Sequence, residues 1–346
     1  FSTRIAISSS TETKNIRHGV TIISTGANPL RTDEYLYGKN SSVLSWFQLD
    51  KMLSEELNTI KKANAWVFIL CVGSREPERP YCSKICCSSA LRNALELKKL
   101  NPDMEIYVLY RDMRTYGLIE YLYTEARDKG IVFIRYKLDG KPEVNEDQYG
   151  RLKVRILDNL LGEHIIIQPD FITLQTAIVP GNNENLAKLF KLPVNQDGFF
   201  SEAHKKFKPV EFSAKGIYFA GLAHYPKPID ETISQAQAAA AKAVTVLSKE
   251  YITTGNEVAS IDLELCAACL TCARVCPSGA VIINAIGKPY VEPAKCRGCG
   301  ICVVECPTRA IALEHFKSDP LLRNVDEALL EQRFTVYSSQ FTVKEQ

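Results

Sequence analysis

Residues 266–277 read CAACLTCARVCP, and residues 296–307 read CRGCGICVVECP. Both stretches have the spacing C-x2-C-x2-C-x3-C followed by a proline. Three closely spaced thiolates wrap one face of an iron–sulfur cube, whereas the fourth cysteine begins a segment that leads away and ligates the other cube. The repeat therefore predicts two [4Fe-4S] clusters in an α+β ferredoxin domain of the bacterial type, over residues 256–316.

The crossed arrangement assigns four cysteines to each predicted cluster. The ligands of the first are Cys266, Cys269, Cys272 and Cys306, and those of the second are Cys296, Cys299, Cys302 and Cys276. Zinc sites commonly use two separated cysteine pairs. Disulfides suit short secreted chains, and we recognise no signal peptide in this sequence. We therefore favour iron–sulfur clusters over both alternatives.

The composition is that of an ordinary globular chain. Of 346 residues, 46% are hydrophobic and 24% are charged, and the net charge is +2. This balance gives no indication of a nucleic-acid partner, and the longest apolar run, residues 65–72, is far too short to span a bilayer. Twelve cysteines without a secretory signal indicate metal binding in a reducing compartment, so we expect a cytoplasmic protein. The chain begins with Phe1, which suggests a processed or fragmentary sequence.

Residues 65–110 have the pattern of a βαβ unit. An apolar run over residues 65–73 predicts a buried parallel strand, residues 81–100 a helix, and residues 105–110 a second strand. No G-x-G-x-x-G turn occurs anywhere in the sequence. The subdomain of about residues 63–169 therefore has the shape of a nicotinamide-binding domain without its phosphate site, which argues against an NAD(P)H-linked reductase.

Four cysteines gather at the turn of this unit instead. Cys71 lies in the turn, and Cys82, Cys86 and Cys87 lie at the head of the helix. Buried free thiols are common in protein cores, and this is the alternative interpretation. Four thiols within 17 residues favour a third metal cluster.

Two strands that end in glycine suggest a flavin site. Residues 18–27 close with Thr-Gly-Ala, and residues 215–221 close with Gly221. A helix rich in small residues, 229–241, follows the second strand after a loop. Its N-terminus offers free N–H groups to an anion or a polarised ring edge. An alanine-rich surface helix is the alternative, but the order of strand, glycine, loop and helix favours a flavin site.

These motifs resemble a known family. The sequence is similar to the C-terminal half of the A subunit of heterodisulfide reductase, the flavin and iron–sulfur component of methanogen-type complexes and their bacterial relatives. The resemblance covers nearly the whole chain and rests on the doubled ferredoxin run and on six shorter motifs. These are TGA (25–27), EYLYG (34–38), CVGSR (71–75), YCSKICC (81–87), DGFF (197–200) and GIYFAG (216–221).

The resemblance implies an α/β flavoprotein domain of the thioredoxin reductase type over residues 1–255, incomplete at its N-terminus. FAD is expected in its first part. By the same resemblance, a [4Fe-4S] cluster near the flavin is ligated by Cys71, Cys82, Cys86 and Cys87. The positions expected to bind FAD are Thr25, Gly26, Ala27, Lys39, Arg92, Gly221, Lys227, Ile229 and Gln235.

Three features depart from the family. Its N-terminal portion, which carries the glycine turn for the FAD pyrophosphate, is absent from this sequence, so we expect tight FAD binding to need a second piece of protein. Lys39 stands where the family often has an acidic residue, and Arg92 where it often has lysine. Both positions are expected near the flavin, so they bear on electron bifurcation more than on electron transfer.

The motifs together predict an oxidoreductase subunit that passes electrons between FAD, the nearby cluster and the two ferredoxin clusters, with flavin-based bifurcation left open. The resemblance implies other heterodisulfide-reductase-type subunits as partners, with a hydrogenase or formate dehydrogenase module and a separate N-terminal flavin-binding polypeptide as further candidates. A flavin-free ferredoxin-type docking or scaffold subunit is the alternative. The amphipathic C-terminal tail, residues 317–346, is expected to cap its own domain or dock a partner.

Overall fold

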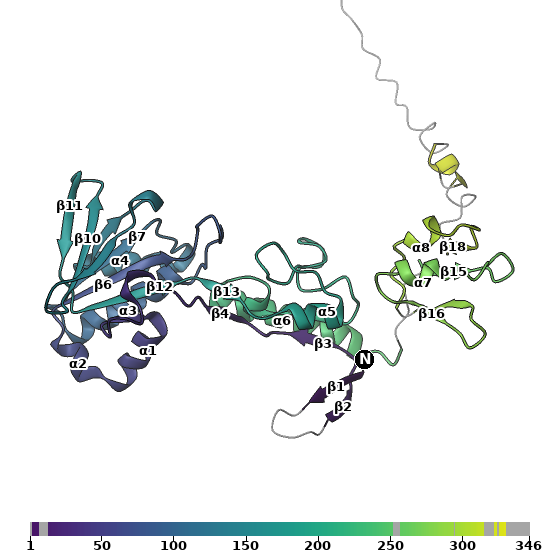
Figure 1. Ribbon diagram of the computed structural model, residues 1–346, viewed down its shortest axis with the longest axis horizontal. Coiled ribbons are helices and arrows are strands. Elements are labelled where there is room, and N and C mark those ends of the chain that lie inside the picture. Colours follow the sequence, from purple (N-terminus) through teal and green to yellow (C-terminus); the bar gives the residue numbers. More distant parts are fainter. Residues whose placement is uncertain are drawn as a thin grey trace, which may run out of the picture. The chain divides into compact units, whose positions relative to one another are not determined.

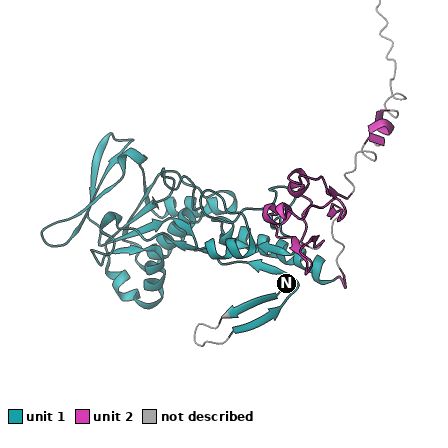
Figure 2. Ribbon diagram, turned by 45° about the vertical axis from the view of Figure 1, so that its right-hand side comes forward, with its two compact units in different colours: residues 1–248 teal, residues 249–346 magenta. Residues whose placement is uncertain are grey.

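The computed structural model describes residues 2–6, 13–251, 257–293, 295–314, 322–323 and 325–329. The chain divides into two compact units, residues 1–248 and residues 249–346 (Figure 2). The predicted domain boundary at residue 255 and most of the predicted tail lie outside the described residues. Among the described residues, no helix has both the length and the apolar character that crossing a membrane requires.

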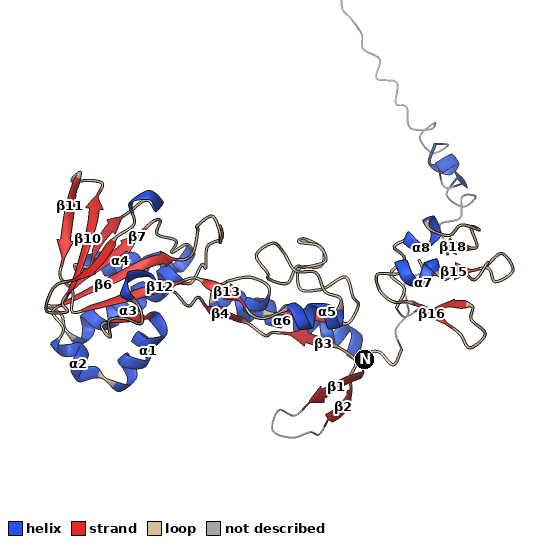
Figure 3. Ribbon diagram, in the orientation of Figure 1, coloured by secondary structure: helices blue, strands red, loops and turns tan. Residues whose placement is uncertain are grey.

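A five-stranded parallel sheet lies at one end of the first unit (Figures 1 and 3). Its strand order is β5-β12-β6-β7-β8. The strands are β5 (Val43–Ser45), β12 (Phe171–Thr176), β6 (Ala65–Val72), β7 (Glu105–Tyr110) and β8 (Val132–Arg135). Seven of the eight residues of β6 are buried and none is charged, which suits a central strand covered on both faces.

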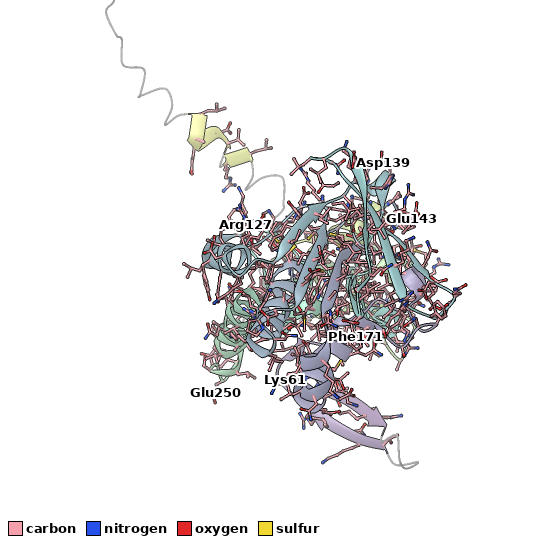
Figure 4. The ribbon with its side chains drawn as sticks, turned by 90° about the vertical axis from the view of Figure 1, so that its left-hand side faces the viewer. Lys61, Arg127, Asp139, Glu143, Phe171 and Glu250 are labelled. Carbon is pink, nitrogen blue, oxygen red and sulfur yellow. The ribbon has the colours of Figure 1, made fainter. Side chains whose placement is uncertain are left out.

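Helices cover one face of this sheet. They are α1 (Trp46–Glu55), α2 (Leu57–Lys62), α3 (Cys86–Leu100) and α4 (Glu120–Asp128). Trp66, Phe68 and Leu70 of β6 pack against this helical layer. Phe171 of β12, labelled in Figure 4, stacks on Trp66 with ring centroids 4.6 Å apart.

An antiparallel sheet covers the other face. Its order is β11-β10-β9, with β9 at Glu143–Glu146, β10 at Leu152–Asp158 and β11 at Glu163–Ile167. Val67, Ile69 and Val72 of β6 share an apolar cluster with Val154 and Ile156 of β10. The alternation along β6 therefore divides the buried side chains between the two layers.

The rest of the first unit consists of shorter elements around two pairs of strands. β3 (Thr21–Ile23) pairs in parallel with β14 (Ile217–Phe219), and β4 (Ala27–Pro29) pairs antiparallel with β13 (Ile178–Pro180). The helices of this part are α5 (Glu184–Phe190) and α6 (Ile229–Leu247). β1 (Ser2–Ala6) and β2 (Thr13–Arg17) form an antiparallel pair at the N-terminus.

Short 3-10 turns occur at four places in the first unit. They are η1 (Glu34–Leu36), η2 (Gly117–Ile119), η3 (Leu138–Gly140) and η4 (Gly221–Ala223).

The second unit repeats one small motif twice. The first copy holds β15 (Ala259–Ile261), α7 (Thr271–Val275) and β16 (Val281–Ile283), and the second holds β17 (Pro289–Val291), α8 (Ile301–Val304) and β18 (Ile311–Leu313). β15 pairs with β18 and β16 pairs with β17, so each strand pair takes one strand from each copy. The predicted α/β fold followed by a small α+β domain is confirmed.

Candidate iron–sulfur and flavin sites

Four cysteines of the second unit line one cavity. They are Cys276, Cys296, Cys299 and Cys302. The set contains Cys276 from the first repeat beside three cysteines of the second, as the crossed ligand pattern requires. Burial and the nearby charges of Cys296, Cys299 and Cys276 together raise the pKa of the Cys302 thiol to about 11. Four thiolates at this spot therefore need a positively charged partner, which iron supplies.

Backbone N–H groups donate to the sulfur of the fourth cysteine in each repeat. Ala280 N–H lies 3.2 Å from Cys276 Sγ, and Ala310 N–H lies 3.3 Å from Cys306 Sγ. Burial raises the pKa of the Cys276 thiol, but hydrogen bonds from Ser278 and Ala280 outweigh this effect and leave the pKa below its ordinary value. These donors favour the thiolate, which is the form that binds metal.

The cysteine loops bend through left-handed backbone conformations at equivalent positions. φ is +53° at Ala268 and +63° at its counterpart Gly298, and it is +60° at Leu270 and +76° at Gly300. A Cβ on Gly298 would lie 2.4 Å from the carbonyl oxygen of Glu257. Glycine is therefore required at Gly298 for close approach as well as for its φ.

The second group of cysteines, Cys71, Cys82, Cys86 and Cys87, lies at the turn between β6 and α3. Cys71 has a φ of +63° near the end of β6, where the pairing with β12 shifts register. Cys86 and Cys87 are the first residues of α3, and Cys82 lies in the turn before it. The turn thus brings together all four thiols that the sequence placed there.

Burial raises the pKa of the Cys71, Cys86 and Cys87 thiols, and for Cys87 the pKa reaches about 12. The charges of other cysteines in the group contribute to all three of these pKa shifts, which reflects how close the four residues lie. Arg75 acts in the opposite direction on Cys71. Such thiols cannot all ionise by themselves, so they stay protonated or bind a cation that displaces their protons.

Buried polar atoms without partners lie in the segments around this turn. Within the described residues, Arg75 Nη1, Gln175 Nε2 and Thr176 Oγ1 have no hydrogen-bond partner. Arg75 follows the turn, and Gln175 and Thr176 end β12, the strand beside β6. A cluster with its thiolate and sulfide acceptors fits the donors of Arg75 and Gln175, whereas Thr176 alternates with Gln175 along β12 and faces the other way.

A single metal ion fits less well. Among the residues that the structure describes, no three His, Cys, Asp or Glu side chains converge closely enough to hold one ion. An iron–sulfur cube spreads its four ligands over several irons, so its cysteines lie farther apart than the ligands of one ion. All twelve cysteines are free thiols, which leaves them available for such clusters.

Three of the predicted flavin residues form one hydrogen-bonded group at the start of α6. Gly221 N–H donates to Gln235 Oε1 at 2.9 Å, and Lys227 Nζ donates to the Gly221 carbonyl at 2.8 Å. Burial lowers the pKa of Lys227 to about 8. Lys227 and Gln235 also line a cavity of about 770 Å³ that includes His224.

Thr25 and Gly26 follow β3, and Gly221 follows β14. Because β3 and β14 are parallel neighbours, their carboxyl ends meet at one edge, which is where ligands of open α/β sheets bind. Thr25 Oγ1 donates to Asn183 Oδ1 at 3.3 Å, and Ala27 begins β4.

Arg92 and Ile229, which are far apart in the sequence, line one cavity of about 300 Å³. The cavity lies between the N-terminal ends of α3 and α6, and Ile85, next to Cys86, forms part of its wall. Trp46 and Pro228 supply further apolar lining. Lys39 lies outside both cavities, exposed in the turn after η1.

The doubled cysteine loops define an iron–sulfur protein of the two-cluster ferredoxin type. Residues 247–318 match the family model of the 4Fe-4S dicluster domain, which brings two [4Fe-4S] clusters. Among curated relatives, the A subunit of the H(2):CoB-CoM heterodisulfide,ferredoxin reductase of Methanothermobacter thermautotrophicus is 35% identical over 335 residues, which are 92% of this chain and 50% of the relative. The A subunit of the H(2)/formate:CoB-CoM heterodisulfide,ferredoxin reductase of Methanococcus maripaludis is 33% identical and aligns with 77% of this chain and 43% of its own.

The chain is therefore a homologue of the A subunit of heterodisulfide reductase over most of its length, as its motifs implied. It spans about half the length of these curated relatives. Among solved structures, the thioredoxin reductase of T. acidophilum aligns with 69% of this chain and 69% of its own at 14% identity and a TM-score of 0.47.

Proposed function

We propose that the chain is an electron-transfer subunit of the heterodisulfide reductase type. Electrons pass between FAD, a [4Fe-4S] cluster held by the Cys71 group and the two clusters of the second unit. The observation that carries this proposal is the meeting of four thiols at one βα turn beside buried donors that lack partners. Iron–sulfur clusters carry single electrons, and a flavin exchanges one or two.

For the second unit we propose the crossed ligand sets. Cys276 joins Cys296, Cys299 and Cys302, with which it lines one cavity. By the equivalence of the two repeats, Cys306 joins Cys266, Cys269 and Cys272 of the first repeat. The N–H donors at Cys276 and Cys306 then hold the two ligands that link the repeats.

For FAD we propose a site between the N-terminal ends of α3 and α6. The cavity there holds Arg92 and Ile229, and the wall that includes Ile85 adjoins the Cys71 group. Arg92 and two helix N-termini are the positive elements of this cavity, and the carboxylates of Asp50 and Asp230 also line it. Thr25, Gly26, Gly221, Lys227 and Gln235 would hold the cofactor near the carboxyl ends of β3 and β14.

The pyrophosphate of FAD needs a glycine turn, and the sequence has no G-x-G-x-x-G. We propose that a second polypeptide segment supplies it. Each charge-assisted hydrogen bond is worth roughly 1.5–3 kcal/mol, so losing several weakens binding by orders of magnitude. The names of the relatives mention H(2), formate, heterodisulfide and ferredoxin. These names support partners of the hydrogenase or formate dehydrogenase type, and they also support flavin-based bifurcation.

Expression of residues 1–346 with and without the N-terminal half of one of these longer relatives tests the shared site. The proposal expects FAD to stay bound through gel filtration only when both pieces are present. Stoichiometric FAD on the isolated chain would contradict the shared site. Iron without FAD in both samples would instead favour the flavin-free scaffold.

A further inference from the structure

Gln175 is a fully buried glutamine at the end of β12. Its side chain is 1% exposed, and its Nε2 has no hydrogen-bond partner within the described residues. A buried amide N–H without an acceptor destabilises a fold, because its bonds to water are lost and not replaced. An acceptor of some kind is therefore expected beside it.

The alternation along β12 shows which way Gln175 faces, because the register shift beside Gln175 places the extra residue on β6. Side chains two residues apart in a strand share a face, so Gln175 faces the same way as Thr173 and Phe171. Thr173 Oγ1 accepts a hydrogen bond from Trp66 Nε1 at 2.8 Å, and Phe171 stacks on Trp66. Trp66 belongs to the apolar cluster of the helical layer, as do Cys71 and Cys87. Gln175 therefore lies on the cysteine side of the sheet.

Two hydrogen bonds join the residues after Gln175 to the segments that carry the cysteines. Ala177 N–H donates to the carbonyl of Val72, the residue after Cys71, at 2.8 Å. Ile178 N–H donates to the hydroxyl of Ser83, the residue after Cys82, at 2.9 Å. These bonds hold the junction of β12 and β13 between the segments that carry two of the four cysteines.

Arg75 offers a second unpaired donor at this turn. Its Nη2 donates to Asp112 Oδ2 at 2.5 Å, whereas its Nη1 is buried and without a partner among the described residues. Arg75 also follows Cys71 closely in the sequence, at the turn that carries the cysteines. Arg75 is therefore anchored at one nitrogen and can donate from another at this turn.

We propose that Gln175 Nε2 and Arg75 Nη1 donate hydrogen bonds to the sulfur atoms of the cluster at the Cys71 group, and so set its reduction potential. The inference rests on the proposed third cluster. Donors to cluster sulfurs stabilise the reduced form more, because it carries more negative charge, and they raise the potential. Gln175 and Arg75 thus act on the cluster sulfurs directly, and neither residue is a ligand of iron.

The test compares wild type with Gln175→Leu in anaerobically loaded full-length chain, by redox titration followed with electron paramagnetic resonance. We expect the third cluster to become harder to reduce by about tenfold, which is about 59 mV for one electron. The two ferredoxin clusters in the same molecule serve as internal references and keep their potentials. Gln168→Leu, the same change at an exposed position, is the matched control.

A wild-type content of about eight irons would overturn the third cluster itself. A content of about twelve irons with an unchanged potential in Gln175→Leu would overturn only the hydrogen bond. Stability gives an independent readout, because the unpaired amide exists only without the cluster. Gln175→Leu should raise the thermal midpoint of the metal-free chain and lower that of the loaded chain, and a rise in both would contradict the inference.

Arg75 is tested by two substitutions that separate the donor from the packing. Arg75→Met removes the donors and the charge, whereas Arg75→Lys keeps both. We expect the potential of the third cluster to fall in Arg75→Met and to stay closer to wild type in Arg75→Lys. An equal shift in both variants would show that Arg75 acts through its shape, and would contradict its role as donor.

Discussion

Ile178 donates its backbone N–H to Ser83 Oγ at 2.9 Å, across 95 positions of sequence. Both residues are buried, and Ser83 lies between Cys82 and Cys86 in a turn without regular secondary structure. Tyr81 adds a second link, because its hydroxyl donates to the Ile178 carbonyl at 3.0 Å. The start of β13 thus fixes the turn that carries Cys82.

Ser83→Ala should lower both stability and iron content. The substitution leaves the buried Ile178 N–H unpaired, which costs about 1–3 kcal/mol in the free energy of unfolding. Denaturant unfolding and iron analysis measure the two effects. Ser234→Ala removes an exposed hydroxyl that bonds only within α6, and it should change neither quantity. Equal behaviour of the two variants would contradict a role for the Ser83 contact.

Gly298→Ala should disrupt the second cysteine loop. The new Cβ would meet the Glu257 carbonyl at 2.4 Å, in a backbone with φ of +63°. Gly287→Ala is the control, because its φ is also positive but nothing lies within 4 Å of the added Cβ. We expect the control to lose about 1–2 kcal/mol from the left-handed conformation alone, and Gly298→Ala to lose more. Thermal unfolding of the loaded chain compares them, and equal losses would contradict the close approach.

Cys276→Ser should perturb the cluster of the second repeat, although Cys276 lies in the first. The reason is that Cys276 lines a cavity with Cys296, Cys299 and Cys302. Electron paramagnetic resonance of Cys276→Ser and Cys296→Ser should show changes in the same cluster signal. Changes in two different signals would contradict the crossed assignment.

The pH dependence of stability should reveal the buried amine of Lys227. Burial lowers its pKa to about 8 in the folded chain, whereas the unfolded value is about 10.4. Between these pH values the unfolded state binds more protons at Lys227 than the folded state does. The free energy of unfolding therefore rises from about pH 8 to about pH 10.4, and this gain is lost again as the pH falls to about 8. In the flavin-free chain, Lys227→Met should remove a rise in stability of up to about 3 kcal/mol across this range.

Urea unfolding at several pH values measures this difference. Lys215→Met, at an exposed position, serves as control and should keep the rise. The buried amine would be contradicted if, relative to Lys227→Met, the free energy of unfolding of the wild-type chain stayed constant or fell over this pH range.

The sequence predicts best where one physical signal dominates. The apolar run of β6 and the strand at 105–110 lie where the patterns place them, because burial on both faces leaves little choice of residue. The helix expected at 81–100 begins only at Cys86, since residues 81–85 form the turn that positions Cys82. The apolar residues over 44–60 predict one helix, but the pairing of β5 with β12 takes the first of these residues, and Glu56 divides the rest into α1 and α2.

In the candidate sites, too, the sequence predicts the features that are local in the chain and misses those that depend on tertiary packing. Cysteine spacing predicts both groups of thiols, because ligand spacing is local in the sequence. The placement of Arg92 and Ile229 at one cavity depends on tertiary packing, and these residues enter the prediction only through the family resemblance. Gln175 was missed, although an amide inside the buried strand Phe-Ile-Thr-Leu-Gln-Thr is a signal that sequence reading can detect.

The central claim is that the Cys71 group holds a [4Fe-4S] cluster, and iron content tests it most directly. Anaerobically loaded full-length chain should contain about twelve irons, four for each of three clusters. The double variant Cys86→Ser/Cys87→Ser should contain about eight and keep both ferredoxin signals in electron paramagnetic resonance. A wild-type content of about eight irons that the double variant leaves unchanged would contradict the account.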